Sequence, residues 1–387
     1  MKKREFIKKL GISGFALANA GLLMQSCDQS AKNNHADGKS PKKNWAWVRP
    51  QIDSWSLDDW KRTLANTKES GIDAILLESY NGHSSIYKHP DPRITMRADL
   101  LEDVVKICKE NDLEFHAWMW SMICNVETIV KEKTEWYNVN GLGEPANLKP
   151  AYVNYYKFMD PLHPEVQEFV QSNVRSLAEI DGVDGVHLDY IRMPDVILAE
   201  GLQPNYNIVQ DKEYPQYDYH YTERARKLFK EQTGIDPLTD LKDPAANKEW
   251  RQFRYDAVTN LVNNYLAPEA KKYGKMVTAA VFPNWESVRQ QWQKWDLDAF
   301  LPMLYHGFYN RGIDFIEEHT RKNLQLLDNE KPIYSGIFMG HVGKEIEKAY
   351  ESALAGGAKG ISLFSLEGIS DQQWDILKTV LTKDKKI

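Results

Sequence analysis

The chain has 387 residues, of which 42% are hydrophobic and 27% are charged, so its composition is that of an ordinary globular protein. Its net charge of −6, with no stripe of Lys and Arg beyond the N-terminus, argues against a partner rich in phosphate, and we expect no nucleic acid to bind. The chain has 12 Trp and 19 Tyr, and such flat amphipathic rings suit sugar faces as well as protein cores.

The N-terminus, residues 1–27, is predicted to be an export signal. Basic residues come first, and an apolar run from Ile12 to Met24 follows that is too short to span a bilayer. Lys3–Lys8 resembles a twin-arginine signal whose first Arg is replaced by Lys, so the export route stays open. Cys27 directly follows the apolar run and resembles the processing site of a lipoprotein, with a simple cleavable signal peptide as the alternative.

Residues 28–44 are polar and rich in Lys, which predicts a flexible tether between this signal and the folded domain. We therefore expect an exported protein that is held at the membrane by a lipid on Cys27 or is free in the periplasm.

Residues 45–387 alternate short apolar runs with amphipathic helical patterns. Eight strands are predicted, at Trp45–Arg49, Asp73–Ser79, Glu114–Trp120, Gly185–Ile191, Lys275–Phe282, Asp298–Tyr305, Pro332–Met339 and Gly360–Leu366. This order predicts an α/β fold, a single (β/α)8 TIM barrel. An open doubly wound sheet is the alternative, but it usually has a Gly-rich phosphate turn after its first strand, and none is present. Cys108 lies on the apolar face of a predicted helix, which indicates a buried thiol rather than half of a disulfide.

The repeat spacing breaks once, at Asp195–Asn247, between the fourth strand and a long helix predicted at Lys248–Tyr273. This stretch holds five Tyr and a short predicted helix around Thr222–Gln232. An insertion after a barrel strand lies on the C-terminal face, where barrel enzymes keep their active sites. We interpret it as a loop excursion that covers the site, and a merely decorative loop is the alternative.

The fourth strand carries the strongest catalytic candidate, Asp189. Side chains alternate along a strand, so His187 shares a face with Asp189 and could hydrogen-bond it or a sugar. Asp189 could act as a nucleophile, a base or the carboxylate that stabilises an oxocarbenium-like transition state. Arg192 lies nearby and would favour the ionised form of Asp189. The structural alternative is an ion pair between Asp189 and Arg192 that only fixes the loop.

Glycosidase chemistry needs two carboxyl groups, one of which protonates the leaving oxygen. Glu286 after the fifth strand and Glu367 after the eighth are the expected partners of Asp189, with Glu78 at the end of the second strand as the third candidate.

Aromatic residues are expected to form the walls of the site. Trp118 and Trp120 share a face with His116 on the third strand, and they are either stacking platforms for sugars or core residues. The residues expected to contact substrate are Glu78, Tyr80, His116, Trp118, Trp120, His187, Arg192, Trp285 and Tyr305.

Metal-assisted hydrolysis is the main rival chemistry, because His83, His116, His187 and His306 could converge at the mouth of the barrel. The sequence has no His-x-His on the first strand, no His-Glu-x-x-His and no paired Cys. We therefore expect no metal and no other cofactor. No G-x-S-x-G elbow or P-loop is present either, which removes the common esterase and nucleotide-binding interpretations.

The segment Asp184–Pro194 resembles the strand-four signature of the family-10-like glycosyl hydrolases, which are bacterial envelope proteins. Phe115–Trp118, Leu301–Tyr305 and Gly360–Ser365 are similar to other segments of that family. The resemblance covers Trp45 to Glu367 and implies a barrel, retention in the envelope and hydrolysis of a glycan, with Asp189 as the catalytic candidate. The family often has Gln-x-Arg at the end of strand two, where this chain has Glu78-Ser79-Tyr80.

The sequence thus predicts an exported glycoside hydrolase that cleaves an envelope or environmental polysaccharide, with Asp189 and one of Glu286 or Glu367 as its working pair. The alternative is a non-catalytic glycan-binding lipoprotein on a barrel scaffold, which would keep Trp118, Trp120 and Tyr305 but need no carboxyl pair.

Overall fold

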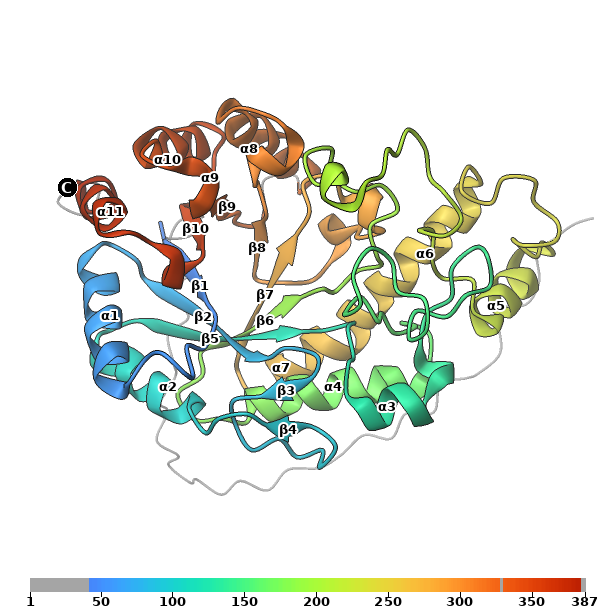
Figure 1. Cartoon of the computed structure of the whole chain (residues 1–387), viewed down its shortest axis with the longest axis horizontal. Helices are drawn as coiled ribbons and strands as arrows, with labels where there is room; N and C mark the ends of the chain where they lie inside the picture. The colour runs from blue at the N-terminus through green and yellow to red at the C-terminus, as the bar shows by residue number, and fades with distance from the viewer. Residues whose placement is uncertain (1–41, 328–329, 384–387) are drawn as a thin grey trace, which may run out of the picture. The chain divides into compact units, whose positions relative to one another are not determined.

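Eight parallel strands form a nearly closed barrel, surrounded by helices (Figure 1). The computed structural model describes residues 42–327 and 330–383. The strands are β1 (Trp45–Val48), β2 (Ala74–Tyr80), β5 (Glu114–Trp120), β6 (Gly185–Asp189), β7 (Met276–Val281), β8 (Ala299–Pro302), β9 (Ser335–Phe338) and β10 (Ile361–Phe364). They follow the order β8-β7-β6-β5-β2-β1-β10-β9, and parallel bridges Phe300–Ile333 and Met303–Gly336 join the two ends of that order. Each strand overlaps a predicted one, and the predicted barrel is confirmed.

Two very short strands, β3 (Ser84–Ser85) and β4 (Thr95–Met96), pair beside the end of β2. The helices are α1 (Leu57–Glu69), α2 (Leu101–Glu110), α3 (Glu127–Glu132), α4 (Pro164–Ala178), α5 (Glu223–Thr233), α6 (Lys248–Leu261), α7 (Ala267–Lys271), α8 (Asp314–Leu326), α9 (Met339–Val342), α10 (Ile346–Ala355) and α11 (Asp371–Lys383). A π-helical turn, Val262–Leu266, joins α6 to α7. Pro268 has no N–H to donate to the preceding turn, which accounts for a local departure from α geometry here.

The core has two shells, which follow from the alternation of side chains along each strand. Outward residues such as Ile75 and Phe115 pack under the helices, whereas inward residues such as Trp47 fill the barrel. Gly185 makes room for this filling, since a Cβ there would lie 2.2 Å from His116 Nδ1. The interior is therefore a packed core with an open site only at its end.

Two long segments extend from the C-terminal ends of neighbouring strands, residues 121–163 after β5 and residues 190–247 after β6. They are joined by an antiparallel bridge between Asn140 and Tyr219 and by the stacked rings of Tyr152 and Tyr217, whose centroids are 4.6 Å apart. The expectation of a single break in the repeat was wrong. Residues 121–163 are held largely by turns and isolated bridges, so no periodic sequence pattern marks them.

Both cysteines of the described chain, Cys108 and Cys124, are buried free thiols, which confirms the expectation for Cys108. The predicted signal at 1–27, its Cys27 and the tether up to residue 41 lie outside the described residues and stay predictions. Within residues 42–327 and 330–383, no helix has the length and apolar character needed to cross a membrane.

Candidate active site

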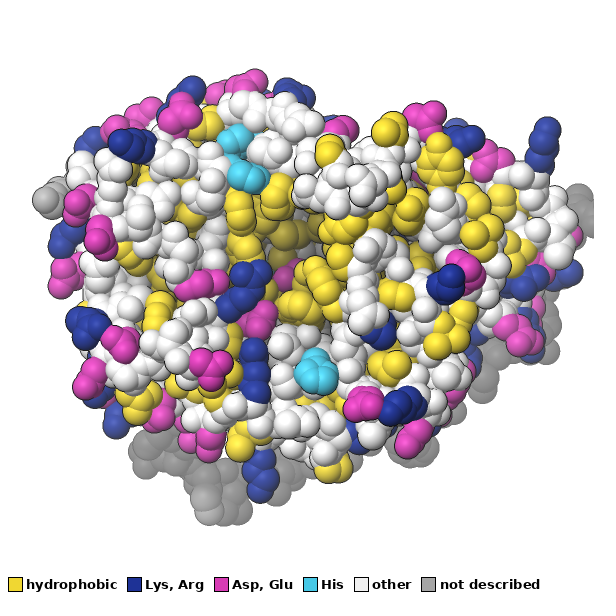
Figure 2. Space-filling view, in the orientation of Figure 1, with side chains coloured by type: hydrophobic (Ala, Val, Ile, Leu, Met, Phe, Trp, Pro, Cys, Tyr) yellow, Lys and Arg dark blue, Asp and Glu magenta, His cyan; other side chains and the backbone are white. Residues whose placement is uncertain are grey.

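A cavity of about 240 Å³ opens at the C-terminal mouth of the barrel, where β5, β6, β8 and β10 end. Its lining residues are Arg49, Trp118, Trp120, Tyr156, Asp189, Tyr190, Arg192, Asp195, Leu198, Ala199, Leu202, Phe282, Met303, Tyr305, Phe308, Tyr309 and Phe364. Figure 2 shows a hollow near the middle of the drawn face, with hydrophobic side chains inside it and charged side chains along one edge. Small-molecule sites usually measure about 300–1,000 Å³, so this cavity suits one ring rather than a long ligand.

Asp189 ends β6 and is the one carboxylate on this cavity that no arginine bonds. Its Oδ2 accepts from Trp118 Nε1 at 3.1 Å, and its Oδ1 accepts from the Tyr190 amide at 2.7 Å. Tyr190 has a φ of 50°, a left-handed conformation that bulky residues rarely adopt and that is concentrated at functional sites.

Burial raises the pKa of Asp189 to about 6, although its two N–H donors and Arg192 act in the opposite direction. Arg192 does favour the ionised form of Asp189, as expected, but desolvation outweighs the charge of this arginine.

Arg192 is engaged elsewhere. Its Nη1 donates to Asp195 Oδ2 at 3.0 Å and to the Met193 carbonyl at 2.8 Å, and its guanidinium lies over the ring of Phe282. An ion pair that fixes the loop does exist, as the structural alternative supposed, but its acid is Asp195 rather than Asp189. Both partners are buried, so the pair ties the start of the 190–247 segment to the cavity wall.

Two further glutamates lie at the ends of β2 and β10, and neither is part of the cavity lining, so Glu78, which was expected to contact substrate, lies outside it. Glu78 on β2 accepts from Arg97 Nη2 at 3.0 Å, and burial raises its pKa in spite of this arginine. The charge of Glu78 in turn raises the pKa of Asp189. Glu367 follows β10, and its Oε1 lies 3.5 Å from Nη1 of Arg49, a residue of the cavity lining.

Glu286 does not join them. It is exposed in the 3-10 turn Trp285–Val288 after β7, and it is absent from the cavity lining. The turn is fastened to other loops, because the Met193 amide donates to the Val288 carbonyl. Trp285 packs against Tyr255 at 5.0 Å between ring centroids and also lies off the cavity. The expected roles of Glu286 and Trp285 at the site are corrected accordingly.

Tyr80 was expected to share a face with Glu78, and this was wrong. A register shift between Glu78 and Tyr80 lets Glu78 pair with Trp118 but sets Tyr80 against Met119, in the outer shell. Tyr80 is fully buried there, at 5.9 Å from the His89 ring.

His116 and His187 are fully buried below the cavity and do not line it. Each lies further from the mouth than the tryptophan or aspartate that follows it on its strand. Trp47 Nε1 donates to His187 Nε2 at 3.0 Å, and His187 Nδ1 shares a hydrogen bond with Thr278. The expectation that these two histidines contact substrate is corrected, because the barrel interior is packed solid at their depth.

Trp118, Trp120, Arg192 and Tyr305 line the cavity together with Asp189, as the sequence had suggested. Trp118 is a buried core residue that also donates a hydrogen bond to Asp189, and stacking of its ring on a sugar stays a prediction. Residues of the predicted excursion, among them Asp195, Leu198 and Leu202, contribute to the wall.

Several lining residues were not predicted. Arg49 directly follows the first strand and Phe364 ends the eighth, and their position alone could have found them. Tyr156 comes from a loop and Phe308 from the 3-10 turn His306–Tyr309, and no periodic pattern marks either of them.

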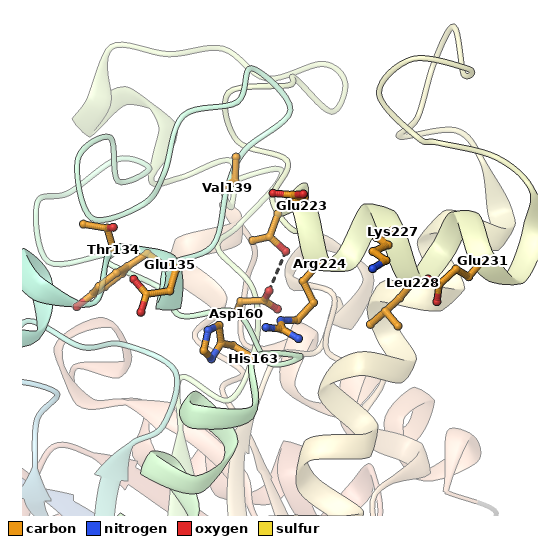
Figure 3. Close-up of a pocket in the computed structure, with 12 residues that line it drawn as sticks. Thr134, Glu135, Val139, Asp160, His163, Glu223, Arg224, Lys227, Leu228 and Glu231 are labelled. Carbon is orange, nitrogen blue, oxygen red and sulfur yellow. Dashed lines mark hydrogen bonds between the residues drawn. The ribbon is translucent and has the colours of Figure 1, made fainter.

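A larger hollow of about 570 Å³ lies apart from this cavity, between the 121–163 segment and α5 (Figure 3). Figure 3 shows Glu135 and His163 on one side and Arg224 and Lys227 on the other. Its buried carboxylate, Asp160, already accepts from Thr222, His220 and the Leu162 amide. Over residues 42–327 and 330–383, no cluster of three or more His, Cys, Asp or Glu could hold a metal ion.

Comparisons with known proteins agree with this architecture. The sequence profile of the glycosyl hydrolase-like 10 family matches residues 68–354. None of the curated proteins is a significant match to the sequence.

Among solved structures, the PgaB (BpsB) glycoside hydrolase domain of Bordetella bronchiseptica is similar, with a TM-score of 0.66, 13% identity, and coverage of 88% of this chain and 99% of that one. The β-amylase catalytic domain of Paenibacillus polymyxa has a TM-score of 0.61 and 12% identity over 88% of this chain and 98% of that one. The β-galactosidase of Marinomonas ef1 has the same TM-score and identity over 89% of this chain and 59% of that one. These likenesses show the fold.

Proposed function

The chain belongs to the glycosyl hydrolase-like 10 family, and we propose that it hydrolyses glycosidic bonds with Asp189 as the proton donor. The observation that carries the proposal is a buried carboxyl with a pKa of about 6 at the C-terminal end of β6, facing a cavity with aromatic walls. A proton donor that works near neutral pH needs a pKa raised in this way, and burial is the usual means of raising it.

In the proposed reaction, Asp189 gives its proton to the glycosidic oxygen as the bond from that oxygen to the anomeric carbon breaks. The electron pair of the bond leaves with the oxygen, and a water molecule adds its hydroxyl to the anomeric carbon at the new reducing end. The proton that this water gives up passes to a carboxylate of the site, so that hydrolysis consumes one water and no net proton. Trp118 Nε1 and the Tyr190 amide already donate to the carboxyl of Asp189, so they stabilise the negative charge that the transfer leaves on it.

We propose Glu78 as the second carboxylate. Its charge acts on Asp189, and Arg97 holds its side chain in place. Glu367, the other candidate from the sequence, is paired with Arg49, which lines the cavity. Both can be compared with Glu286, which is exposed.

The substrate proposed is a polysaccharide of the cell envelope or the surroundings, reached by export through the signal at 1–27 and a lipid on Cys27. The basic start, the apolar run and the cysteine that follows it support this. Replacing Cys27→Ala should release the protein from membranes or block its processing. Membrane association that is unchanged by this substitution would contradict the anchor.

The test of hydrolysis is the release of reducing ends from a panel of polysaccharides and isolated envelope glycans by the full chain. Wild type should release ends from at least one of them, and Asp189→Asn should release almost none. Asp184→Asn, at the opposite end of the same strand, is the matched control and should retain activity.

A second function, glycan binding without catalysis, is favoured by one observation. The carboxylates of the cavity lining are Asp189 and Asp195, and Arg192 already occupies Asp195. If wild type retains a glycan in affinity electrophoresis but releases no reducing ends from any glycan, this second function replaces the first.

A further inference from the structure

We propose that the substrate chain lies across the whole barrel mouth, on aromatic surfaces at both sides of Asp189, and that it is cleaved at internal bonds. This inference rests on the proposed function and adds the class of substrate, a polymer with sugar units on both sides of the bond that breaks.

The first aromatic surface begins at the cavity wall and leads outward over the 121–163 segment. The ring of Trp120 lies 4.7 Å from the ring of Tyr190, and both line the cavity. Trp120 also lies 5.8 Å from Tyr155, whose side chain is 43% exposed. A large aromatic side chain this exposed, and continuous with the wall of a site, is typical of a binding surface rather than of a core.

The second aromatic surface begins at the opposite wall. Phe308 and Phe364 line the cavity, and each lies within 6.0 Å of Phe338, outside the lining. Phe338 is half-buried, and its ring is 4.4 Å from that of the exposed His341. This set too leads from the cavity to the outer surface of the mouth.

The order of the strands places the two surfaces on opposite sides of the mouth. Trp120 belongs to β5, the direct neighbour of β6 and Asp189. Phe338 and Phe364 end β9 and β10, and β10 is four strands from β6 in either direction around the barrel. A ligand that touches both Tyr155 and Phe338 must therefore pass over the cavity between them.

The cavity itself has room for about one ring. Flat aromatic faces beyond it, on two sides, give a polymer further contacts on both flanks of the unit held beside Asp189. An enzyme that only removed terminal units would need such contacts on one side alone. This is why the arrangement favours internal cleavage.

The experiment uses the full chain and the polysaccharide that gives reducing ends in the panel above, together with its oligosaccharides of two to eight units labelled at one end. Product lengths are followed from the earliest times for wild type, Tyr155→Ala and Phe338→Ala. Tyr273→Ala is the control, because Tyr273 is similarly exposed, at 39%, but lies just before β7, at the far end of the barrel.

We expect wild type to produce fragments of mixed length at once. Tyr155→Ala and Phe338→Ala should each raise the KM for long chains about threefold to tenfold and leave the KM for the shortest cleaved oligosaccharide nearly unchanged. In the labelled series, the two variants should shift the preferred cleavage position in opposite directions. Phe338→Leu repeats the test with less loss of packing. Tyr273→Ala should behave as wild type.

Release of only one-unit or two-unit products from a chain end, or equal effects of the variants on short and long chains, would overturn the inference while leaving hydrolysis intact. If no glycan yields reducing ends, hydrolysis fails, and internal cleavage fails with it. Affinity electrophoresis of Asp189→Asn then tests, without any cleavage, whether a glycan chain binds across both aromatic surfaces. Retention that increases with the length of the glycan and is weakened by Tyr155→Ala supports this binding mode, and retention that does not depend on length rejects it.

Discussion

The two ends of strand β6 carry the same residue type in opposite surroundings. Asp184, just before the strand, has a side chain that is 32% exposed, pairs with Lys109 at 2.6 Å and accepts from the Phe115 amide at 2.7 Å. Asp189, at the other end, is buried, and no cation bonds it among the described residues. The comparison shows that the group that is unfavourable for stability, a buried carboxyl without a cationic partner, lies at the mouth of the barrel. One end of the strand is arranged for stability, and the end at the mouth keeps a carboxyl that burial destabilises in its charged form.

The largest expected contrast between the two ends is in turnover. Asp189→Asn should lower kcat/KM about a thousandfold or more, because the amide cannot donate an acidic proton and general acids contribute about 10²–10⁴-fold. Asp184→Asn should stay within about threefold of wild type, since its side chain lies away from the cavity. Initial rates of reducing-end release measure both variants. Similar losses in the two variants would mean that Asp189 acts only through folding.

The second contrast is in stability, and its sign follows from the raised pKa of Asp189. The folded state holds this proton up to about pH 6, whereas the unfolded chain releases it near its ordinary pKa of 3.8, so stability falls as pH rises from about 4 to 6. The cost above that range is at most about 3 kcal/mol. Asp189→Asn should therefore be more stable than wild type at pH 7, by up to this amount, and close to wild type at pH 4.

Urea unfolding at pH 4 and pH 7 measures this difference. Asp184→Asn is the opposite case and should be less stable than wild type by about 1 kcal/mol at pH 7, because it weakens the pair with Lys109. A stability difference between Asp189→Asn and wild type that does not change with pH would contradict the raised pKa.

The third prediction concerns the pH dependence of activity. If Asp189 donates the proton, kcat/KM should fall as pH rises above about 6. Glu78→Gln removes a charge that raises the pKa of Asp189, so it should move this falling limb to lower pH. A rate that instead increases through pH 6 would assign Asp189 the role of base or nucleophile.

The smallest expected effect compares the glutamates. Glu78→Gln should lower kcat at its optimum more than Glu367→Gln does, and Glu286→Gln should leave it unchanged within about twofold, since Glu286 is exposed and off the cavity. Rates of all three variants at their own pH optima give the order. A loss for Glu286→Gln as large as that for Glu78→Gln would restore Glu286 as the partner of Asp189.

The barrel and the position of Asp189 could be predicted because both depend on short-range patterns. Apolar runs of strand length alternate with helical spacing, and the period of two along a strand places Asp189, Trp118 and Trp120 at the mouth. The same pattern could not show the depth at which His116 and His187 would be enclosed, because that depth depends on side chains such as Trp47 and Thr278 from other strands.

The sequence by itself thus determined the eight strands, their order of appearance and the acid at the end of β6. Only the tertiary structure decided which polar side chains lie around that acid. A single register shift in β2 separated Tyr80 from Glu78, a turn fastened to another loop removed Glu286, and Asp195 rather than Asp189 took Arg192. The first two outcomes depend on contacts between residues far apart in the chain, whereas the third pairs residues three apart in the loop after β6. The desolvation that raises the pKa of Asp189 exists only once residues from several strands enclose it.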